Sequence, residues 1–233
     1  MMKEAITLDE IRRFRLMVGQ PVNGYRFSLD ALLLAEFVNC PDFSRIADLG
    51  TGCGVIPMIL CRRFSGTEAV GIENNSTMAA LAQENVERNG LTDQIQTISC
   101  DITEIKSLYP VSSFDGIVSN PPFRAQGTGR ISPKSGRDTA RHEATAGIAD
   151  FLATAKYLVK PSGRIWFVYH PDRFAEFIQC ATQLKLSLLR LQMVHSSHDS
   201  PAKIFLAELV KGRKGELRIE APIILQKDCA GRI

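Results

Sequence analysis

Strand-like and helical runs alternate along the chain, and this alternation restricts the available folds more than any other feature. Five short apolar runs have the length of buried strands, and helical runs separate them. A βαβ order needs a crossover between successive strands, so the strands are expected to lie parallel in one sheet. The predicted strands are Arg45–Leu49, Ala69–Glu73, Ile95–Cys100, Asp115–Ser119 and Arg164–Tyr169.

The last part of the sheet is expected to reverse direction. A helix near Asp172–Leu184 precedes two further strand-like runs, Ser187–Met193 and Ile204–Val210. The connection His195–Lys203 is long enough only for a hairpin-like return, so the final strand is expected to be antiparallel to its neighbours. The sequence therefore predicts an α/β fold with a mostly parallel, doubly wound, seven-stranded sheet whose last strand is antiparallel.

Two helices have recognisable ends. The clearest helix is predicted over Asn75–Asn89, and Gly90 is the residue type best suited to its C-terminal cap. Ser28 is a candidate N-cap for an apolar helix over Leu29–Val38. Asp30 lies in the first turn of that helix, where the helix dipole favours a negative charge.

The length and apolar content fit one compact domain. The chain has 233 residues, of which 45% are hydrophobic, enough to build a full core. We expect residues 1–40 to form an N-terminal segment with a helix, and residues 41–233 to form the main domain. The formal charge of +3 favours a polyanionic partner only weakly.

The cellular setting is indicated by the cysteines and by the absence of targeting signals. The 6 cysteines form no C-x-x-C pair and several lie in apolar runs, which is typical of reduced, mostly buried thiols. No signal peptide is recognisable at the N-terminus, and no window has the roughly 18 apolar residues of a membrane span. We expect a soluble, cytoplasmic protein without a membrane partner.

A glycine-rich loop follows the first predicted strand. Its letters are D-L-G-T-G-C-G, and its candidate ligand-binding residues are Asp48, Gly50, Thr51, Gly52 and Gly54. Dinucleotide-binding loops space their glycines as G-x-G-x-x-G because a pyrophosphate lies on the helix N-terminus, whereas these glycines follow G-x-G-x-G after an aspartate. S-adenosylmethionine has no phosphate but has a cationic amino group that Asp48 can serve directly or through water. The spacing favours this cofactor, with a nicotinamide or flavin site and a purely structural turn as alternatives.

Acidic residues also follow the next two predicted strands. Glu73 ends the second strand, where a carboxylate can accept hydrogen bonds from both hydroxyls of a ribose. Asp101 follows the third strand and can accept from an adenine amine, while Ile102 offers an apolar contact to the ring. The alternatives are a solvated carboxylate at Glu73 and a helix N-cap at Asp101. Together with Asp48, the two acids favour a cofactor site at this edge of the sheet.

The tetrapeptide Asn120-Pro121-Pro122-Phe123 follows the fourth strand and is the most specific signal in the chain. Prolines fix the backbone, so the Asn120 side chain and the Pro121 carbonyl can be held rigidly. An amine conjugated to an aromatic ring is a poor nucleophile, and two acceptors can bind its two N–H groups and favour the tetrahedral nitrogen of the transition state. Phe123 can stack on the base. The alternative is a rigid turn with a buried aromatic side chain.

The stretch from Phe123 to His142 is rich in glycine and basic residues and is expected to form a long loop. Arg124, Arg141 and His142 are candidates for contacts to a phosphate or to the target, and an ordinary solvated loop is the alternative. Two further histidines, His195 and His198, have no other clear metal ligands nearby, so no metal site is expected.

The motifs resemble those of a known enzyme family. The loop D-L-G-T-G-C-G and the tetrapeptide N-P-P-F are similar to those of amino-group methyltransferases that act on adenine in nucleic acid or on glutamine in release factors. The segment Asn23–Ala35 is similar to the start of bacterial tRNA adenine N6-methyltransferases, which modify adenosine 37 beside the anticodon of a valine tRNA. Looser similarity covers most of the chain, through R-H-E, K-P-S-G and S-P-A-K at 141–143, 160–163 and 200–203.

The resemblance implies a Rossmann-like class I methyltransferase fold that uses S-adenosylmethionine. It also implies that the segment around Gln20 and Phe27–Asp30 closes over the methionine end of the cofactor, and that Asn120–Phe123 hold the target base. Phe123 is a departure, because tyrosine is frequent at that position in these families; stacking is kept, but the tyrosine hydroxyl is lost.

The preferred function is therefore methylation of the exocyclic N6 amine of adenine in RNA, with tRNA or another structured RNA as the partner. Methylation of a protein glutamine amide and of adenine or guanine in ribosomal RNA are alternatives that use the same acceptors. A nicotinamide-dependent oxidoreductase and a non-catalytic RNA-binding protein are further alternatives from other classes. The sequence leaves a monomer and a homodimer equally open.

Overall fold

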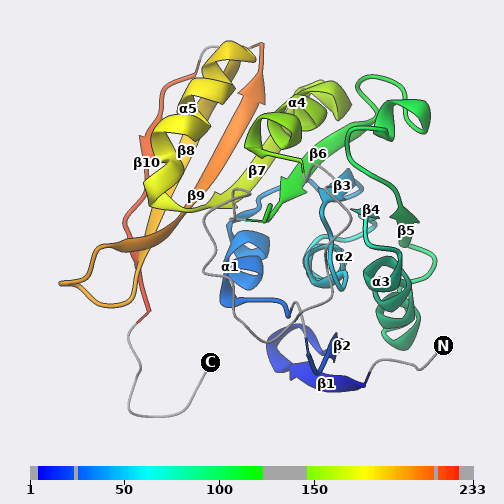
Figure 1. Ribbon diagram of the computed structural model, residues 1–233. Helices are drawn as coiled ribbons and strands as arrows, with labels where there is room; N and C mark the ends of the chain where they lie inside the picture. The colour runs from blue at the N-terminus through cyan, green and yellow to red at the C-terminus, as the bar shows by residue number, and fades with distance from the viewer. Residues whose placement is uncertain (1–4, 24–25, 123–145, 213–214, 226–233) are drawn as a thin grey trace, which may run out of the picture.

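A twisted central sheet organises the chain (Figure 1). The computed structural model describes residues 5–23, 26–122, 146–212 and 215–225, and in these residues the main sheet has nine strands in the order β10-β8-β9-β7-β6-β3-β4-β5, with β11 also paired to β8. The strands are β3 (Arg45–Leu49), β4 (Glu68–Glu73), β5 (Ile95–Ser99), β6 (Phe114–Ser119), β7 (Val159–Tyr169), β8 (Leu186–His195), β9 (Ala202–Lys211), β10 (Arg218–Ile219) and β11 (Ile223–Ile224).

The strand directions confirm the predicted fold class. The strands β3 to β7 pair parallel to one another, and β9 pairs antiparallel with both β7 and β8. The sheet is wider than the predicted seven strands, because the two-residue strands β10 and β11 add to β8 in parallel. These additions lie far from the carboxyl ends of β3, β4 and β6, where the predicted site residues lie.

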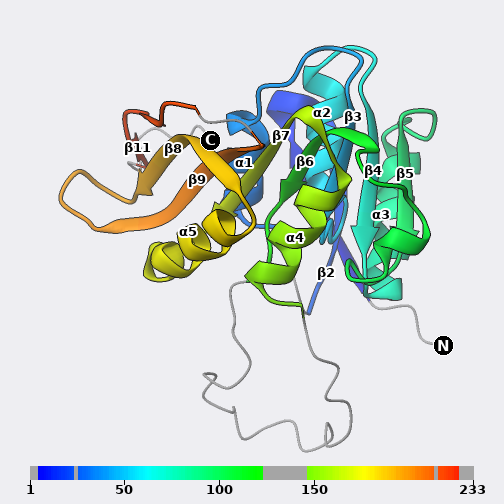
Figure 2. The same ribbon diagram turned by 90° about the horizontal axis from the view of Figure 1, so that it is seen from above.

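Helices cover both faces of the sheet (Figure 2). The helices α1 (Leu29–Phe37), α2 (Val55–Arg63) and α3 (Ser76–Arg88) pack on one face, and α4 (Ile148–Leu158) and α5 (Phe174–Gln183) pack on the other. Successive strand side chains alternate between the two cores: Ile46 packs toward the first helix layer and Ala47 toward the second. This alternation buries both faces, as expected for a doubly wound parallel sheet.

The predicted helix ends are largely confirmed. The Asn75 side chain accepts hydrogen bonds from the backbone N–H groups of Thr77 and Met78 at the start of α3, and Gly90 follows that helix with a φ of 64°. Ser28 occupies the N-cap position of α1, but its side chain makes no capping hydrogen bond. The backbone carbonyl of Ser28 accepts from the N–H of Ala31. The Ser28 hydroxyl is not used for capping, and Ser28 lines the pocket described below.

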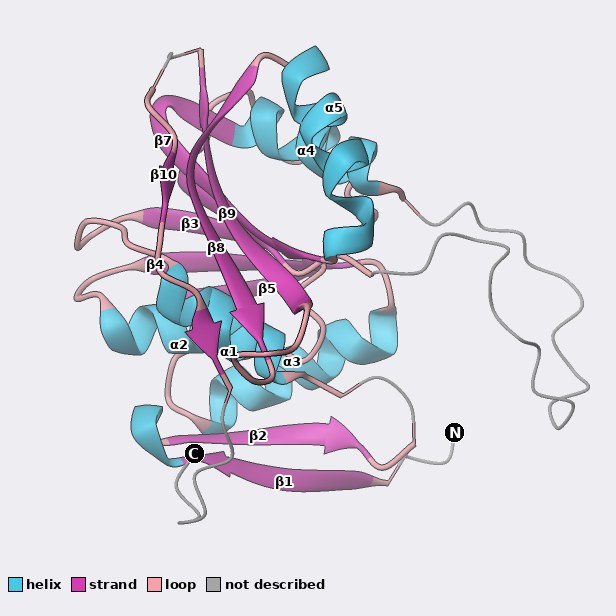
Figure 3. Ribbon diagram, turned by 90° about the vertical axis from the view of Figure 1, so that its left-hand side faces the viewer, coloured by secondary structure: helices cyan, strands magenta, loops and turns pink. Residues whose placement is uncertain are grey.

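An N-terminal hairpin, β1 (Ile6–Ile11) and β2 (Leu16–Pro21), was not predicted. It lies outside the α1–α3 layer, on the side away from the sheet (Figure 3). Its turn is a short 3-10 helix, η1 (Arg12–Phe14), followed by Arg15 in the left-handed region with a φ of 52°. Because no glycine or asparagine marks this turn, the sequence lacks the usual signal of a hairpin.

Two asparagines, one within α3 and one at its C-cap, attach the hairpin to the domain. Asn85, which is completely buried, accepts from the N–H of Gly19 at 2.7 Å and donates to its carbonyl at 2.9 Å. Asn89 makes the same pair of bonds with Met17, at 2.9 and 2.8 Å. The Asn85 amide also donates to the carbonyl of Cys53 at 2.9 Å, so one side chain joins β2 to the glycine-rich loop.

The cysteines are free thiols in the part of the chain that the structure describes. Cys40, Cys53 and Cys61 are buried, and Cys100 and Cys180 are half-buried. Burial raises the pKa of Cys40 to about 11 and the pKa of Cys53 to about 12, so both are protonated at neutral pH. None of the described helices is both long enough and apolar enough to cross a membrane.

We predict that Asn85→Ala lowers the free energy of unfolding by about 2–4 kcal/mol, because it leaves buried backbone groups of Gly19 and Cys53 without partners. Chemical denaturation measures the loss. Glu87→Ala, at an exposed position of the same helix, is the control and is expected to change stability by less than about 0.5 kcal/mol. Equal stability of the two variants would contradict the bracing role of Asn85.

Candidate active site

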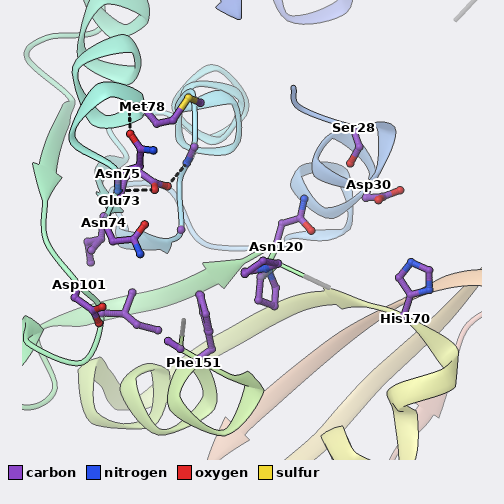
Figure 4. A pocket seen from close by; sticks show the side chains of 17 residues that line it. Ser28, Asp30, Glu73, Asn74, Asn75, Met78, Asp101, Asn120, Phe151 and His170 are labelled. Carbon is purple, nitrogen blue, oxygen red and sulfur yellow. Dashed lines mark hydrogen bonds between the residues drawn. The ribbon is translucent and has the colours of Figure 1, made fainter. Parts of the chain in front are cut away.

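A pocket with a volume of about 950 Å³ opens at the carboxyl ends of the parallel strands. It gathers residues from five loops, because the carboxyl ends of parallel strands lie at one edge of the sheet. Most of the predicted site residues that the structure describes line it: Asp30, Gly50, Gly52, Glu73, Asp101, Ile102, Asn120, Pro121 and Pro122. Figure 4 shows how the side chains of Asp30, Glu73, Asp101 and Asn120 lie around the cavity.

The glycine-rich loop forms one wall of the pocket. Gly50 and Gly52 have φ values of 76° and 57°, which side chains rarely adopt, and the N–H of Gly50 donates to the carbonyl of Ile72 at 2.8 Å. The loop therefore presents bare backbone to the cavity. Asp48, Thr51 and Gly54, also predicted for this site, do not line the pocket; Gly54 is instead the N-cap residue of α2 and packs against Ala82.

Asp48 lies beneath this loop and is 1% exposed. Among the described residues, neither of its carboxylate oxygens has a hydrogen-bond partner. Burial raises the pKa of Asp48 to about 7, and the charge of Glu73 adds to this shift. The nearby Thr51 hydroxyl opposes the shift although it is not in hydrogen-bonding geometry with the carboxylate. A buried carboxylate with unused acceptors favours a cationic or water ligand above it.

Glu73 is held at the rim by two backbone amides. Its Oε2 accepts from Gly52 at 2.9 Å and its Oε1 from Asn75 at 3.0 Å (Figure 4). Each carboxylate oxygen retains a second lone pair, so the group can still accept from two hydroxyls. The Glu73 carboxylate is thus fixed in position before any ligand arrives.

Asp101 combines the two roles that the sequence left open. Its Oδ1 accepts from the N–H of Thr103 at 2.8 Å and from the Thr103 hydroxyl at 2.7 Å, which makes it a local cap for the following turn. The same residue lines the pocket, beside the buried side chain of Ile102. The capping alternative therefore does not remove Asp101 from the site.

Asn120 directly follows β6 and is 9% exposed. Its Oδ1 is buried and has no hydrogen-bond partner in the part of the chain that the structure describes. The preceding Ser119 donates its hydroxyl hydrogen to the carbonyl of Leu49 at 2.7 Å, which fixes the end of β6 against β3. Pro121 is buried beside Asn120, and both residues line the pocket. This arrangement presents a rigid, unused acceptor to a ligand.

Some predicted residues lie elsewhere. Phe27 does not line the pocket; it packs against the core, and its N–H donates to Oε1 of Gln20 at 2.8 Å. The tetrapeptide's last residue and the basic candidates lie outside the described residues, namely Phe123, Arg124, Arg141 and His142.

The sequence missed several pocket residues. His170 follows β7, so the rule that selected Glu73 and Asn120 would also have found it. Phe151 of α4 and Met78 of α3 reach the pocket from helices, and only the packing of those helices places them there. Ser28, by contrast, belongs to the segment Phe27–Asp30 that the resemblance implies for the cofactor, and it lines the pocket at the start of α1.

The residues present fit S-adenosylmethionine. The bare backbone of the glycine loop and the unpaired Asp48 carboxylate suit the amino-acid end of the cofactor. The fixed Glu73 carboxylate suits its ribose, and the Asp101–Ile102 pair suits its adenine. Within the described ranges, no group of three or more histidine, cysteine, aspartate or glutamate side chains is arranged to hold a metal ion.

Comparison with known proteins agrees with this geometry. The methyltransferase small domain family matches residues 29–198. The tRNA1(Val) (adenine(37)-N6)-methyltransferase of Vibrio campbellii is 28% identical, over 87% of this chain and 82% of the relative. That of Trichodesmium erythraeum is 32% identical, over 91% and 90% of the two chains.

A solved structure supports the fold. The crystal structure of a predicted O-methyltransferase from Agrobacterium tumefaciens aligns with a TM-score of 0.68 at 24% identity, covering 85% of this chain and 88% of that one. The chain is an S-adenosylmethionine-dependent methyltransferase with the class I fold, and it belongs to the methyltransferase small domain family and to the family of the tRNA1(Val) (adenine(37)-N6)-methyltransferases.

Proposed function

We propose that the protein transfers a methyl group from S-adenosylmethionine to the N6 amine of an adenine in tRNA, at the position beside the anticodon of a valine tRNA. The observation that carries this proposal is the buried Oδ1 of Asn120, which has no partner among the described residues. A buried acceptor without a partner costs free energy, so it is expected to bind a donor in the working complex. The names of the family relatives supply the adenine and the tRNA.

The acceptor amine is activated by its hydrogen bonds. Asn120 Oδ1 and the Pro121 carbonyl accept its two N–H groups and thereby favour the tetrahedral nitrogen over the planar one. The two prolines and the Ser119–Leu49 hydrogen bond hold these acceptors in place. Phe123 stacks on the base in this proposal, and Arg124, Arg141 and His142 contact the neighbouring phosphates.

The cofactor half of the pocket has a separate task. When bound, S-adenosylmethionine supplies a methyl group already activated by its sulfonium charge, so the reaction needs no metal ion. Glu73 accepts hydrogen bonds from the ribose hydroxyls, and Asp101 and Ile102 contact the adenine ring. From beneath the glycine-rich loop, the negative charge of Asp48 compensates the positive charge of the amino group. These residues orient the methyl donor toward Asn120.

The decisive experiment is transfer of labelled methyl to bulk tRNA, ribosomal RNA and a release factor in parallel, followed by digestion of the products. N6-methyladenosine from the tRNA fraction is expected. Label found only in protein would show that the methyl acceptor is a glutamine amide and not an adenine, since the amide also offers two N–H groups to Asn120 and Pro121. Label only in ribosomal RNA would keep the chemistry and change the RNA.

We predict that Asn120→Ala lowers kcat by about 10²- to 10³-fold, because an acceptor for the reacting amine is lost. Calorimetry with S-adenosylhomocysteine is expected to show nearly unchanged cofactor affinity. Glu73→Ala is the matched comparison and is expected to weaken cofactor affinity first. If both variants lose turnover and affinity equally, the division of the pocket into two halves is wrong.

We also predict a pH dependence of cofactor binding that originates in Asp48. Because its pKa is raised to about 7, Asp48 is protonated at pH 5.5 in the free protein and must ionise to balance the cationic amino group. The affinity for S-adenosylhomocysteine should therefore rise by up to about tenfold per pH unit as pH increases toward 7. Asp48→Asn should bind more weakly and remove this slope. An unchanged slope in Asp48→Asn would assign the titration to another group.

A further inference from the structure

The sheet order divides the pocket into two halves. Along the edge, Asp101 follows β5, Glu73 ends β4, the glycine loop follows β3, Asn120 follows β6 and His170 follows β7. Neighbouring strands are about 4.8 Å apart, so this order is also an order in space. The residues proposed for the cofactor occupy β3 to β5. The half beyond Asn120, over β6 and β7, is therefore left for the acceptor.

His170 has a fixed place in this acceptor half. The parallel register pairs Ser119 of β6 with Phe167 of β7, so His170 follows β7 at the level where Pro122 follows β6. The preceding Tyr169 is 1% exposed, with its ring centroid 6.2 Å from that of Phe177. The His170 carbonyl accepts from Arg173 at 3.1 Å to start the 3-10 helix η3 (Pro171–Arg173). The backbone of His170 is thus held on both sides.

The start of α1 forms the opposite wall of this half. Ser28 and Asp30 line the pocket, and Figure 4 shows both, with His170, on the other side of Asn120 from Glu73 and Asp101. The entry to α1 is anchored to the hairpin: Gln20 accepts from Phe27, and Arg26 donates to Asp9 at 2.7 Å. The backbone that leads into α1 is therefore held in place, and Asp30 lies half-buried in the first turn of that helix.

The chemistry of this half matches a sugar hydroxyl better than a phosphate. A carboxylate repels a phosphate but accepts a hydrogen bond from a hydroxyl, and an imidazole N–H can donate to the same oxygen. In a polynucleotide the 3′ and 5′ oxygens are esterified, so the 2′-hydroxyl is the free hydroxyl of the ribose. This group is also what distinguishes RNA from DNA at a given site.

We infer that Asp30 and His170 bind the 2′-hydroxyl of the target nucleotide and make the enzyme select RNA over DNA. The inference rests on the proposed adenine methylation. It places Asp30 on the acceptor, whereas the family resemblance implies a role at the methionine end of the cofactor. The two residues are specificity-determining, while the Asn120 and Pro121 acceptors carry the chemistry.

The experiment compares two anticodon-arm stem-loops that differ by one atom, with adenosine or 2′-deoxyadenosine at the methylated position. For the unaltered enzyme, kcat/KM is expected to fall by about tenfold or more on the deoxy stem-loop, the effect of a lost hydrogen bond to a charged group. In Asp30→Ala and His170→Ala, the ribose stem-loop should react about as slowly as the deoxy one, so that the ratio approaches one.

The controls separate this role from folding and from cofactor binding. His198→Ala removes an exposed histidine outside the pocket and should keep the full preference for ribose. Affinity for S-adenosylhomocysteine should stay within about twofold in both pocket variants, since each loses contacts only to the acceptor. Weakened cofactor affinity in Asp30→Ala would overturn the assignment of Asp30.

Equal rates of the unaltered enzyme on the two stem-loops would overturn the inference while leaving adenine methylation intact. A preference for ribose that both variants retain would also overturn it. Failure to form N6-methyladenosine in any RNA would instead overturn the proposed function, and the inference with it.

Discussion

Parallel pairing of β3 with β4 and β6 is the constraint on which the site depends. Leu49 pairs with Ile72 on one side and with Ser119 on the other, so all three strands end at the same level. Asp48, Glu73 and Asn120, distant in sequence, therefore lie at one edge. Main-chain hydrogen bonds set this alignment, and the Ser119 hydroxyl reinforces it through the Leu49 carbonyl.

The site keeps buried acceptors unsatisfied, which opposes folding but favours binding. Asp48 and the Asn120 amide oxygen are almost fully buried and have no hydrogen-bond partners among the described residues. Each costs free energy until a donor arrives. The fold tolerates this cost because the surrounding core is extensive: Ile46, Leu49 and Val118 beside these residues are completely buried. Stability elsewhere thus offsets a locally unfavourable site.

The N-terminal hairpin links the glycine-rich loop on one side of the pocket to the start of α1 on the other side. Asn85 of α3 bonds to Gly19 of β2 and to Cys53 of the glycine-rich loop, so the cofactor wall and the hairpin share one buried side chain. From the hairpin, Gln20 holds the N–H of Phe27, just before Ser28 and Asp30 enter the pocket. A continuous set of hydrogen bonds therefore runs from the glycine loop to the opposite wall.

The sequence by itself determined the fold class, the cofactor loop and the strand-end residues, because strand periodicity, glycine spacing and prolines act over a few neighbouring residues. Glu73 and Asn120 were identifiable for this reason. Only the tertiary structure decided that Phe151 and Met78 line the pocket and that residues 6–21 form a hairpin. It also decided that four predicted residues do not line the pocket, namely Phe27, Asp48, Thr51 and Gly54. Those outcomes depend on how helices pack on the sheet and on hydrogen bonds such as Asn85 to Gly19, which join residues 66 positions apart. No local pattern encodes such contacts, since their free energy exists only once the chain has folded.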